Sequence, residues 1–320
     1  MALCSALGVR SAVAQSGNAA STLVPPPPPE VQWYSLGEYG TFGYTRPKFL
    51  QSIRNAPGTI VGTVEFAADR GRLGQWAMLI GSTAATIAAD EWLLDQSRRV
   101  AHAVDLPRNH PSVNVRVGSL KIVPLPTTLG SALYFLGDGA VSLGVAGGFF
   151  VYGAAQQDNR AFRTASQITE SLLAAGTFTQ ILKHVTGRQT PSEATEPRGR
   201  WNWFPSLGDY NANVPGHDAF PSGHLAVALA TVEVVAMNYP EKRFVRPVGY
   251  SLLTLLSFAM MNNGVHWASD YPLAIALGRT VAGVAVERGR TVGGGTGPRA
   301  AGLQPLVAPG RIGVLIPLGR

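Results

Sequence analysis

The sequence predicts an all-α protein, a six-helix bundle with an irregular N-terminal arm and a C-terminal tail. Six apolar segments, rich in small residues, follow one another between residues 73 and 288, whereas alternating strand patterns are few. Such segments become stable when they bury their apolar faces against one another, which favours a helical bundle. Both flanks instead mix Gly and Pro with little periodicity, so we expect them to lie outside the bundle.

The first 72 residues divide into two parts. Residues 1–30 contain Ala12-Val13-Ala14, which is typical of a signal-peptidase site, and a run of five prolines at 25–29. We interpret them as an export signal followed by a stiff spacer. A disordered leader is the alternative, because the apolar stretch is short and no basic residue precedes it. Residues 31–72 form the irregular arm, in which 59–66 is compatible with a short strand.

The helical domain occupies residues 73–288. Helices are expected at residues 76–89, 127–155, 162–185, 225–237, 248–261 and 272–286. The second is interrupted at Gly137-Asp138-Gly139, where we expect a helix break rather than a buried functional acid. The third carries a polar stripe that leads towards Lys183. Residues 289–320 form the Gly/Pro-rich tail, in which 311–318 is compatible with a terminal strand.

Composition narrows the functional classes. The chain has a net charge of +7 with only 14% charged residues, which fits an anionic substrate or a membrane surface. Dense basic patches with interleaved aromatics are absent, which argues against nucleic acid. The single cysteine, Cys4, excludes an internal disulfide and a cysteine-based metal site. Residues 139–157 and 247–269 lack charges over nearly the length of a bilayer span or more, so both a soluble or partly embedded bundle and a six-span protein remain open.

The first motif is Phe220-Pro221-Ser222-Gly223-His224, directly before an apolar run. It predicts a tight turn that enters a helix, with Ser222 as N-cap and Gly223 allowing close approach of a ligand. The free N–H groups of a first helical turn bind anions, and His224 stands beside them as a proton donor. An ordinary capped helix with a surface histidine is the alternative.

Two further motifs carry chemistry. Lys183 and Arg188 place cations at the end of the third helix, where they also complement the helix dipole. His266 and Asp270 are four residues apart, so on a helix they would share a face. A carboxylate on one imidazole nitrogen fixes the tautomer and raises the basicity of the other nitrogen, as a nucleophilic histidine requires. An incidental surface pair is the alternative.

Together, in this order, the motifs resemble the type-2 phosphatidic acid phosphatase superfamily, which also includes class A bacterial acid phosphatases and vanadium haloperoxidases. The family pattern is Lys-x6-Arg-Pro, then Pro-Ser-Gly-His, then Ser-Arg-x5-His-x3-Asp. The chain matches it at Lys183, Pro191, Pro221, Ser222, Gly223, His224, His266 and Asp270. The resemblance covers residues 73–287 and implies a bundle of the phosphatidic acid phosphatase and haloperoxidase type.

Two family arginines are missing. Thr190 and Met260 stand at their positions, and Ala259 replaces the serine before the second. In the family these arginines clamp the phosphate, and a bidentate arginine contact is hard to replace. Arg188 lies in the same turn and is the candidate substitute. Other candidates are Arg198, Arg200, Asn262 and Asn263, the last two of which have helix capping as an alternative role.

The resemblance also implies a mechanism. His266 attacks phosphorus and forms a phosphohistidine, Asp270 orients His266, and His224 protonates the leaving alcohol and later activates water. The phosphate is held by Lys183, Ser222, Gly223 and Arg188. Neither a metal ion nor another cofactor is expected, because cationic and N–H groups neutralise the transferring phosphoryl group.

The resulting prediction is an exported, cell-envelope phosphoric monoester hydrolase, periplasmic or membrane-associated. Its substrate would be a lipid phosphate or another organic phosphate. The alternative is a catalytically weakened relative that binds anionic ligands or has a structural role in the envelope, and a vanadium-dependent haloperoxidase is more distant. A lipid substrate predicts membrane contact through the apolar helices or through the aromatic residues at 201–204, which otherwise cover an apolar face.

Overall fold

The predicted all-α class is confirmed by a computed structural model that describes residues 31–108, 112–117, 120–292, 304–308 and 311–315. The expected export signal and proline spacer lie outside the described residues. The helices are α1 (Gln51–Ala68), α2 (Leu73–Ala103), α3 (Leu129–Phe135), α4 (Gly139–Gln156), α5 (Asn159–Thr186), α6 (Leu207–Ala212), α7 (Gly223–Asn238), α8 (Val245–Asn262) and α9 (Tyr271–Gly289).

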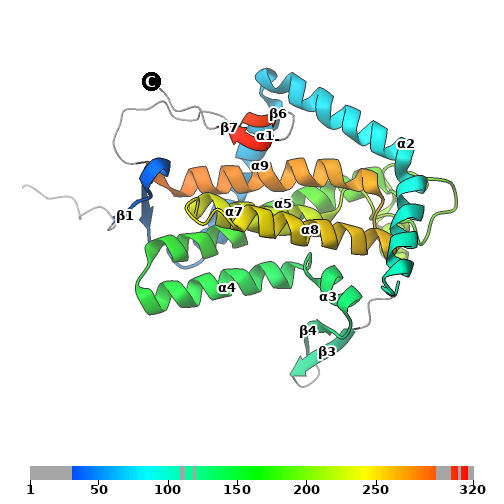
Figure 1. Cartoon of the computed structure of the whole chain (residues 1–320), viewed down its shortest axis with the longest axis horizontal. Helices are drawn as coiled ribbons and strands as arrows, with labels where there is room; N and C mark the ends of the chain where they lie inside the picture. The colour runs from blue at the N-terminus through cyan, green and yellow to red at the C-terminus, as the bar shows by residue number, and fades with distance from the viewer. Residues whose placement is uncertain (1–30, 109–111, 118–119, 293–303, 309–310, 316–320) are drawn as a thin grey trace, which may run out of the picture.

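Helices α5, α7 and α9 form the centre of the bundle, and α4 and α8 run beside them (Figure 1). Helix α7 is apolar on nearly all sides, so it is stable only when neighbours surround it. Its Leu225 belongs to a buried apolar cluster that includes Leu256 of α8 and Val281 of α9, and further along, Val234 belongs to a second cluster that includes Ile168 of α5. Each such buried side chain stabilises the fold by roughly 1.5–3 kcal/mol.

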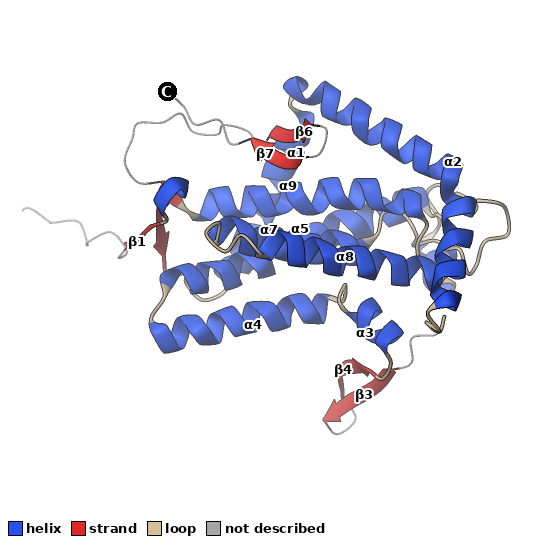
Figure 2. Cartoon of the chain, in the orientation of Figure 1, coloured by secondary structure: helices blue, strands red, loops and turns tan. Residues whose placement is uncertain are grey.

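Strands are confined to the periphery (Figure 2). Strands β1 (Val31–Ser35) and β2 (Thr41–Thr45) form an antiparallel hairpin, which β5 (Thr291–Val292) extends at the end of α9. Two further antiparallel hairpins pair β3 (Ser112–Val117) with β4 (Leu120–Pro126), and β6 (Gln304–Ala308) with β7 (Arg311–Leu315). The expected terminal strand is therefore present at β7.

The N-terminal arm differs from the prediction. Residues 59–66, compatible with a strand by sequence, lie in α1, so that expectation was wrong. The buried residues Ala56, Thr59 and Thr63 recur at helical spacing, and Thr59 donates a hydrogen bond to the buried Glu170 of α5. Tertiary packing against α5 and α9 therefore overrides the strand-forming tendency of the Thr and Val residues.

Helix α2 is also longer than expected, because it continues past Asp90 to Ala103. The expected helix stopped at residue 89, just before the acidic pair Asp90-Glu91, yet Asp90 is fully buried in the middle of α2. In contrast, the break at Gly137-Asp138-Gly139 is confirmed. Asp138 caps α4 by accepting a hydrogen bond from the Ala140 N–H (2.7 Å).

One end of the bundle gathers several chain segments that carry the motifs. There α5 and α8 end, α7 and α9 begin, and α2 crosses the bundle, at the right in Figure 1. The Ser222 N–H donates to the Asp270 carbonyl (3.1 Å), and the Thr186 hydroxyl donates to the Phe220 carbonyl (3.0 Å). These bonds join the three motifs, although they are far apart in the sequence.

Candidate functional site

The sequence motifs meet at this end of the bundle. Lys183 lies in the last turn of α5, Gly223 is the first residue of α7, and His266 precedes the short 3₁₀ turn Ala268–Asp270 before α9. A Cβ atom built on Gly223 would lie 3.9 Å from the Lys183 Nζ. The ring centroids of His224 and His266 are 6.3 Å apart.

Helix α7 begins as the sequence predicts. Ser222 is its N-cap, and the Ser222 hydroxyl oxygen accepts a hydrogen bond from the Leu225 N–H (3.4 Å). The Ser222 side chain is fully buried, so its hydroxyl acts on the helix start in this structure. Its binding of phosphate stays a prediction, as does that of Gly223.

His266 has the surroundings of an oriented imidazole. It is 1% exposed, and its Nδ1 lies 2.8 Å from the Ala219 carbonyl oxygen and 3.3 Å from the Asp270 Oδ2. Because both neighbours are acceptors, the proton belongs on Nδ1 and the lone pair on Nε2. The two motif residues meet across a 3₁₀ turn rather than along an α-helix face, since the Asp270 Oδ2 also accepts from the Trp267 N–H (2.8 Å).

Lys183 is buried and paired. Its Nζ lies 3.2 Å from the Oδ2 of Asp218, a partly buried carboxylate in the loop before α7. Asp218 was not among the predicted site residues. The ammonium group therefore reaches the start of α7, but part of its charge is neutralised by a carboxylate.

The structure corrects the expectation that Arg188 replaces a missing phosphate clamp. Arg188 is fully buried. Its Nη1 donates to Asp270 Oδ1 (2.6 Å) and to Ser269 Oγ (2.6 Å), and its Nη2 donates to Asp90 Oδ2 (2.7 Å) and to the Arg198 carbonyl (2.8 Å). Its Nε donates to the Arg198 carbonyl as well (3.3 Å). All five guanidinium N–H groups are thus engaged inside the protein.

Asp90 is the buried carboxylate that sequence reasoning missed. It accepts hydrogen bonds from the Ser269 N–H (2.9 Å) and the Ser269 hydroxyl (2.5 Å), in addition to Arg188. Burial raises the pKa of the Asp90 carboxyl, while the hydrogen bonds from Ser269 and Arg188 oppose that shift. An acidic residue directly after an apolar segment was the available signal, but the expected helix stopped at residue 89 and left Asp90 outside it.

Neutral side chains occupy the positions of the two missing arginines. Met260 is fully buried in the apolar core, and the Thr190 hydroxyl is 3.0 Å from the Ser192 hydroxyl. Asn263 is the C-cap of α8, which supports its capping role, but its side-chain nitrogen is buried with no acceptor in the described part of the chain. The Asn262 side chain donates to the Pro107 carbonyl (3.4 Å).

Aromatic groups surround the site. The Tyr134 ring is 4.9 Å from the His224 ring, so α3 covers the half-buried His224. Trp201 lies over the Arg188 guanidinium at 4.8 Å, consistent with a covering role. Trp203 and Phe204 are 61% and 72% exposed, and these two residues present apolar rings to the outside.

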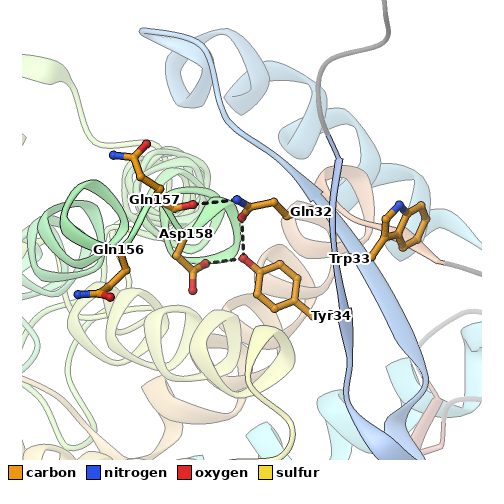
Figure 3. Close-up of a pocket in the computed structure, with 6 residues that line it drawn as sticks. All are labelled: Gln32, Trp33, Tyr34, Gln156, Gln157 and Asp158. Atoms are coloured by element: carbon orange, nitrogen blue, oxygen red, sulfur yellow. Dashed lines mark hydrogen bonds between the residues drawn. The ribbon is translucent and has the colours of Figure 1, made fainter.

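A separate cavity of about 350 Å³ lies at the opposite end, beside β1 and the α4–α5 turn (Figure 3). There Tyr34 donates to Asp158 (2.8 Å) and the Gln32 amide donates to the Gln157 carbonyl (2.8 Å). These bonds attach the hairpin to the bundle.

Within the described ranges, no group of three or more His, Cys, Asp or Glu side chains is arranged to hold a metal ion.

Comparison with known proteins agrees with the motif pattern. Residues 165–291 match the model of the PAP2 superfamily, which confirms the predicted resemblance over the segment that contains all three motifs. No curated protein sequence matches the chain. Among solved structures, the crystal structure of Aquifex aeolicus LpxE is similar at 17% identity, covering 49% of this chain and 83% of that one, with a TM-score of 0.37. The family match supports a phosphatase.

Proposed function

Because residues 165–291 match the PAP2 superfamily model, we propose that this chain hydrolyses phosphoric monoesters through a phosphohistidine on His266. The observation that carries the proposal is the orientation of the His266 ring. Its Nδ1 faces two acceptors, the Ala219 carbonyl and Asp270, which leaves the Nε2 lone pair for attack. An imidazole held in this tautomer is a competent nucleophile at neutral pH.

The reaction would proceed in two displacements. In the first, the His266 Nε2 forms a bond to phosphorus, the bond from phosphorus to the leaving oxygen breaks, and His224 gives its proton to that oxygen. In the second, His224 takes a proton from water, the water oxygen attacks phosphorus, and the P–N bond breaks to restore His266. Asp270 stabilises the Nδ1 proton in both steps.

The phosphate would lie at the N-terminus of α7, where first-turn N–H groups and Lys183 offer positive potential. Both positions of the family arginines are apolar or neutral, and Arg188 is fully engaged elsewhere. We therefore expect weak binding of the phosphate group in the ground state. This depletion also favours a second candidate, a catalytically weakened protein that binds anionic ligands or has a structural role in the envelope.

We propose a lipid phosphate as the substrate class, and membrane association as the setting. Helix α4 is long and apolar enough to cross a membrane by length and composition, and 17% of it is buried within the protein. It exposes Phe150 and Val151, while Trp203 and Phe204 are exposed in the loop that leads from the site. Lipid contact would cover these side chains and bring a lipid headgroup near α7. Export to the cell envelope is part of the same proposal.

The test is hydrolysis of a chromogenic phosphomonoester and of a dispersed phosphatidic acid by wild type, His266→Ala and His102→Ala. His102 is an exposed histidine of α2 and is the matched control. The proposal predicts vanadate-sensitive turnover that His266→Ala abolishes and His102→Ala retains. If folded wild type turns over neither substrate but binds vanadate, the weakened binder replaces the enzyme. Faster hydrolysis of the lipid than of the soluble ester would favour the lipid substrate.

A further inference from the structure

Four side chains form a continuous buried chain behind His266. Asp90 of α2 binds the Arg188 Nη2 (2.7 Å), and the Arg188 Nη1 binds Asp270 Oδ1 (2.6 Å). Ser269 also bridges Asp90 and Arg188, since its hydroxyl donates to Asp90 Oδ2 (2.5 Å) and accepts from Arg188 (2.6 Å). All four side chains are fully buried, so water screens none of these contacts.

The charges along this chain are unequal. Two carboxylates share one guanidinium, so one negative charge is left over. Asp270 uses Oδ1 for Arg188, and its Oδ2 accepts from the Trp267 N–H (2.8 Å) and faces the His266 Nδ1 (3.3 Å). The excess negative charge is therefore available to the ring proton of His266.

We propose that Asp90 is a positioning residue that keeps the negative charge of Asp270 available to the His266 ring by taking part of the charge of Arg188. This inference rests on the proposed phosphohistidine function of His266. With Asp90 neutral, Arg188 would pair with Asp270 alone and draw its electron density away from the His266 ring. Helix α2 would then belong to the catalytic centre, although it lies outside the segment that matches the family.

A purely structural role for Asp90 is the competing account. Asp90 also ties α2 to the turn at Ser269, so its loss could loosen the site without any electrostatic effect on Asp270. The two accounts differ in what a second substitution does. If the loss of Asp90 acts by letting the Arg188 charge draw electron density from Asp270, removing the Arg188 charge as well should restore activity. If Asp90 only ties α2 in place, the second substitution breaks more contacts and lowers activity further.

The kinetic experiment compares Asp90→Asn with the double variant Asp90→Asn/Arg188→Gln, which leaves no unpaired charge behind Asp270. Asp95→Asn, an exposed aspartate on α2, is the control. We expect Asp90→Asn to lower kcat by about 10- to 100-fold with KM within about twofold, as for other partners of catalytic ligands. The double variant should recover about tenfold, and the control should match wild type. Unchanged kcat in Asp90→Asn, or a double variant slower than the single one, overturns the proposal.

A second measurement does not depend on turnover. In protein labelled with nitrogen-15 histidine, the ring N–H signal of His266 is identified by its loss in His266→Ala. We expect it to move upfield in Asp90→Asn, return in the double variant, and stay in place in Asp95→Asn. If the His266 signal shifts as expected but wild type hydrolyses no phosphomonoester, the proposed function fails and the link from Asp90 to His266 stands. A His266 signal that does not shift in Asp90→Asn overturns the proposed link from Asp90 to His266. If Asp90→Asn does not fold, the double variant is compared with wild type instead. Its His266 signal is expected near the wild-type position, and a large shift would overturn the proposal.

Discussion

Replacing Asp218 by Asn is expected to tighten the binding of phosphate and vanadate. The Asp218 carboxylate lies 3.2 Å from the Lys183 Nζ and competes with any anion that this ammonium would hold. Asn keeps the shape and one oxygen acceptor for Lys183 but removes the negative charge. The variant therefore separates the charge of Asp218 from its packing.

The magnitude follows from Coulomb's law. A phosphate on the far side of the Lys183 Nζ would lie about 6 Å from the Asp218 carboxylate, and at an effective dielectric constant of about 20 one unit charge then contributes roughly 3 kcal/mol. The Asp218 side chain is 27% exposed, so solvent and salt screening reduce this to about 1–2 kcal/mol. The dissociation constant of vanadate should fall by about five- to thirtyfold.

The assay is calorimetric titration with orthovanadate and with inorganic phosphate, which needs no turnover. Asp209→Asn is the control, because Asp209 is an exposed aspartate in α6 that contacts Ser206 rather than Lys183. Added salt should reduce the gain, since the effect is electrostatic. Unchanged or weaker binding in Asp218→Asn would refute the reasoning and would mean that Asp218 positions Lys183 for the anion.

Three further outcomes are expected. Burial raises the pKa of the Glu170 carboxyl above its ordinary value of 4.5. The protonated carboxyl therefore favours the folded state, and this contribution to stability is lost as the pH rises through the raised pKa. Because Gln cannot ionise, the Tm of Glu170→Gln should rise relative to that of wild type as the pH increases from about 5 to 8. A variant with a lower Tm than wild type at every pH would mean that Glu170 is ionised in the folded protein. Gly223→Ala should fold normally, because the nearest atoms to the new Cβ are 3.5 Å away or more. The new Cβ would lie beside the Lys183 Nζ, so KM should rise by about tenfold. An unchanged KM would mean that the phosphate binds elsewhere. Gly278→Ala places a Cβ 2.5 Å from the backbone oxygen of Ala226, so chemical denaturation should show a loss of about 1–3 kcal/mol, and a neutral result would mean that α7 and α9 can separate.

The sequence predicted the features that depend on near neighbours in the chain. The N-cap at Ser222, the break before α4 and the contact between His266 and Asp270 all arise within four residues. The apolar helices of the bundle were also recognisable, because α7 and its neighbours carry long runs without charge. Local pattern was enough for each of these features.

The electrostatic arrangement of the site was not predictable in the same way. Arg188 contacts Asp90 across 98 positions of sequence, and Lys183 contacts Asp218 across 35. A buried charge pair looks polar in sequence, so the expected helix stopped before Asp90, and Arg188 was interpreted as a cation available to phosphate. Helix α1 was missed because its buried face is made of Ala and Thr rather than large apolar residues.

The central claim is a phosphoryl group carried on His266, and trapping that group tests it most directly. Wild type, His266→Ala and His102→Ala would be mixed with a radiolabelled phosphomonoester and quenched during turnover. The account predicts label on wild type and on His102→Ala that survives base and is lost in acid, as expected of a phosphohistidine, and no label on His266→Ala. Turnover by wild type without such label, or label retained in His266→Ala, would contradict the account.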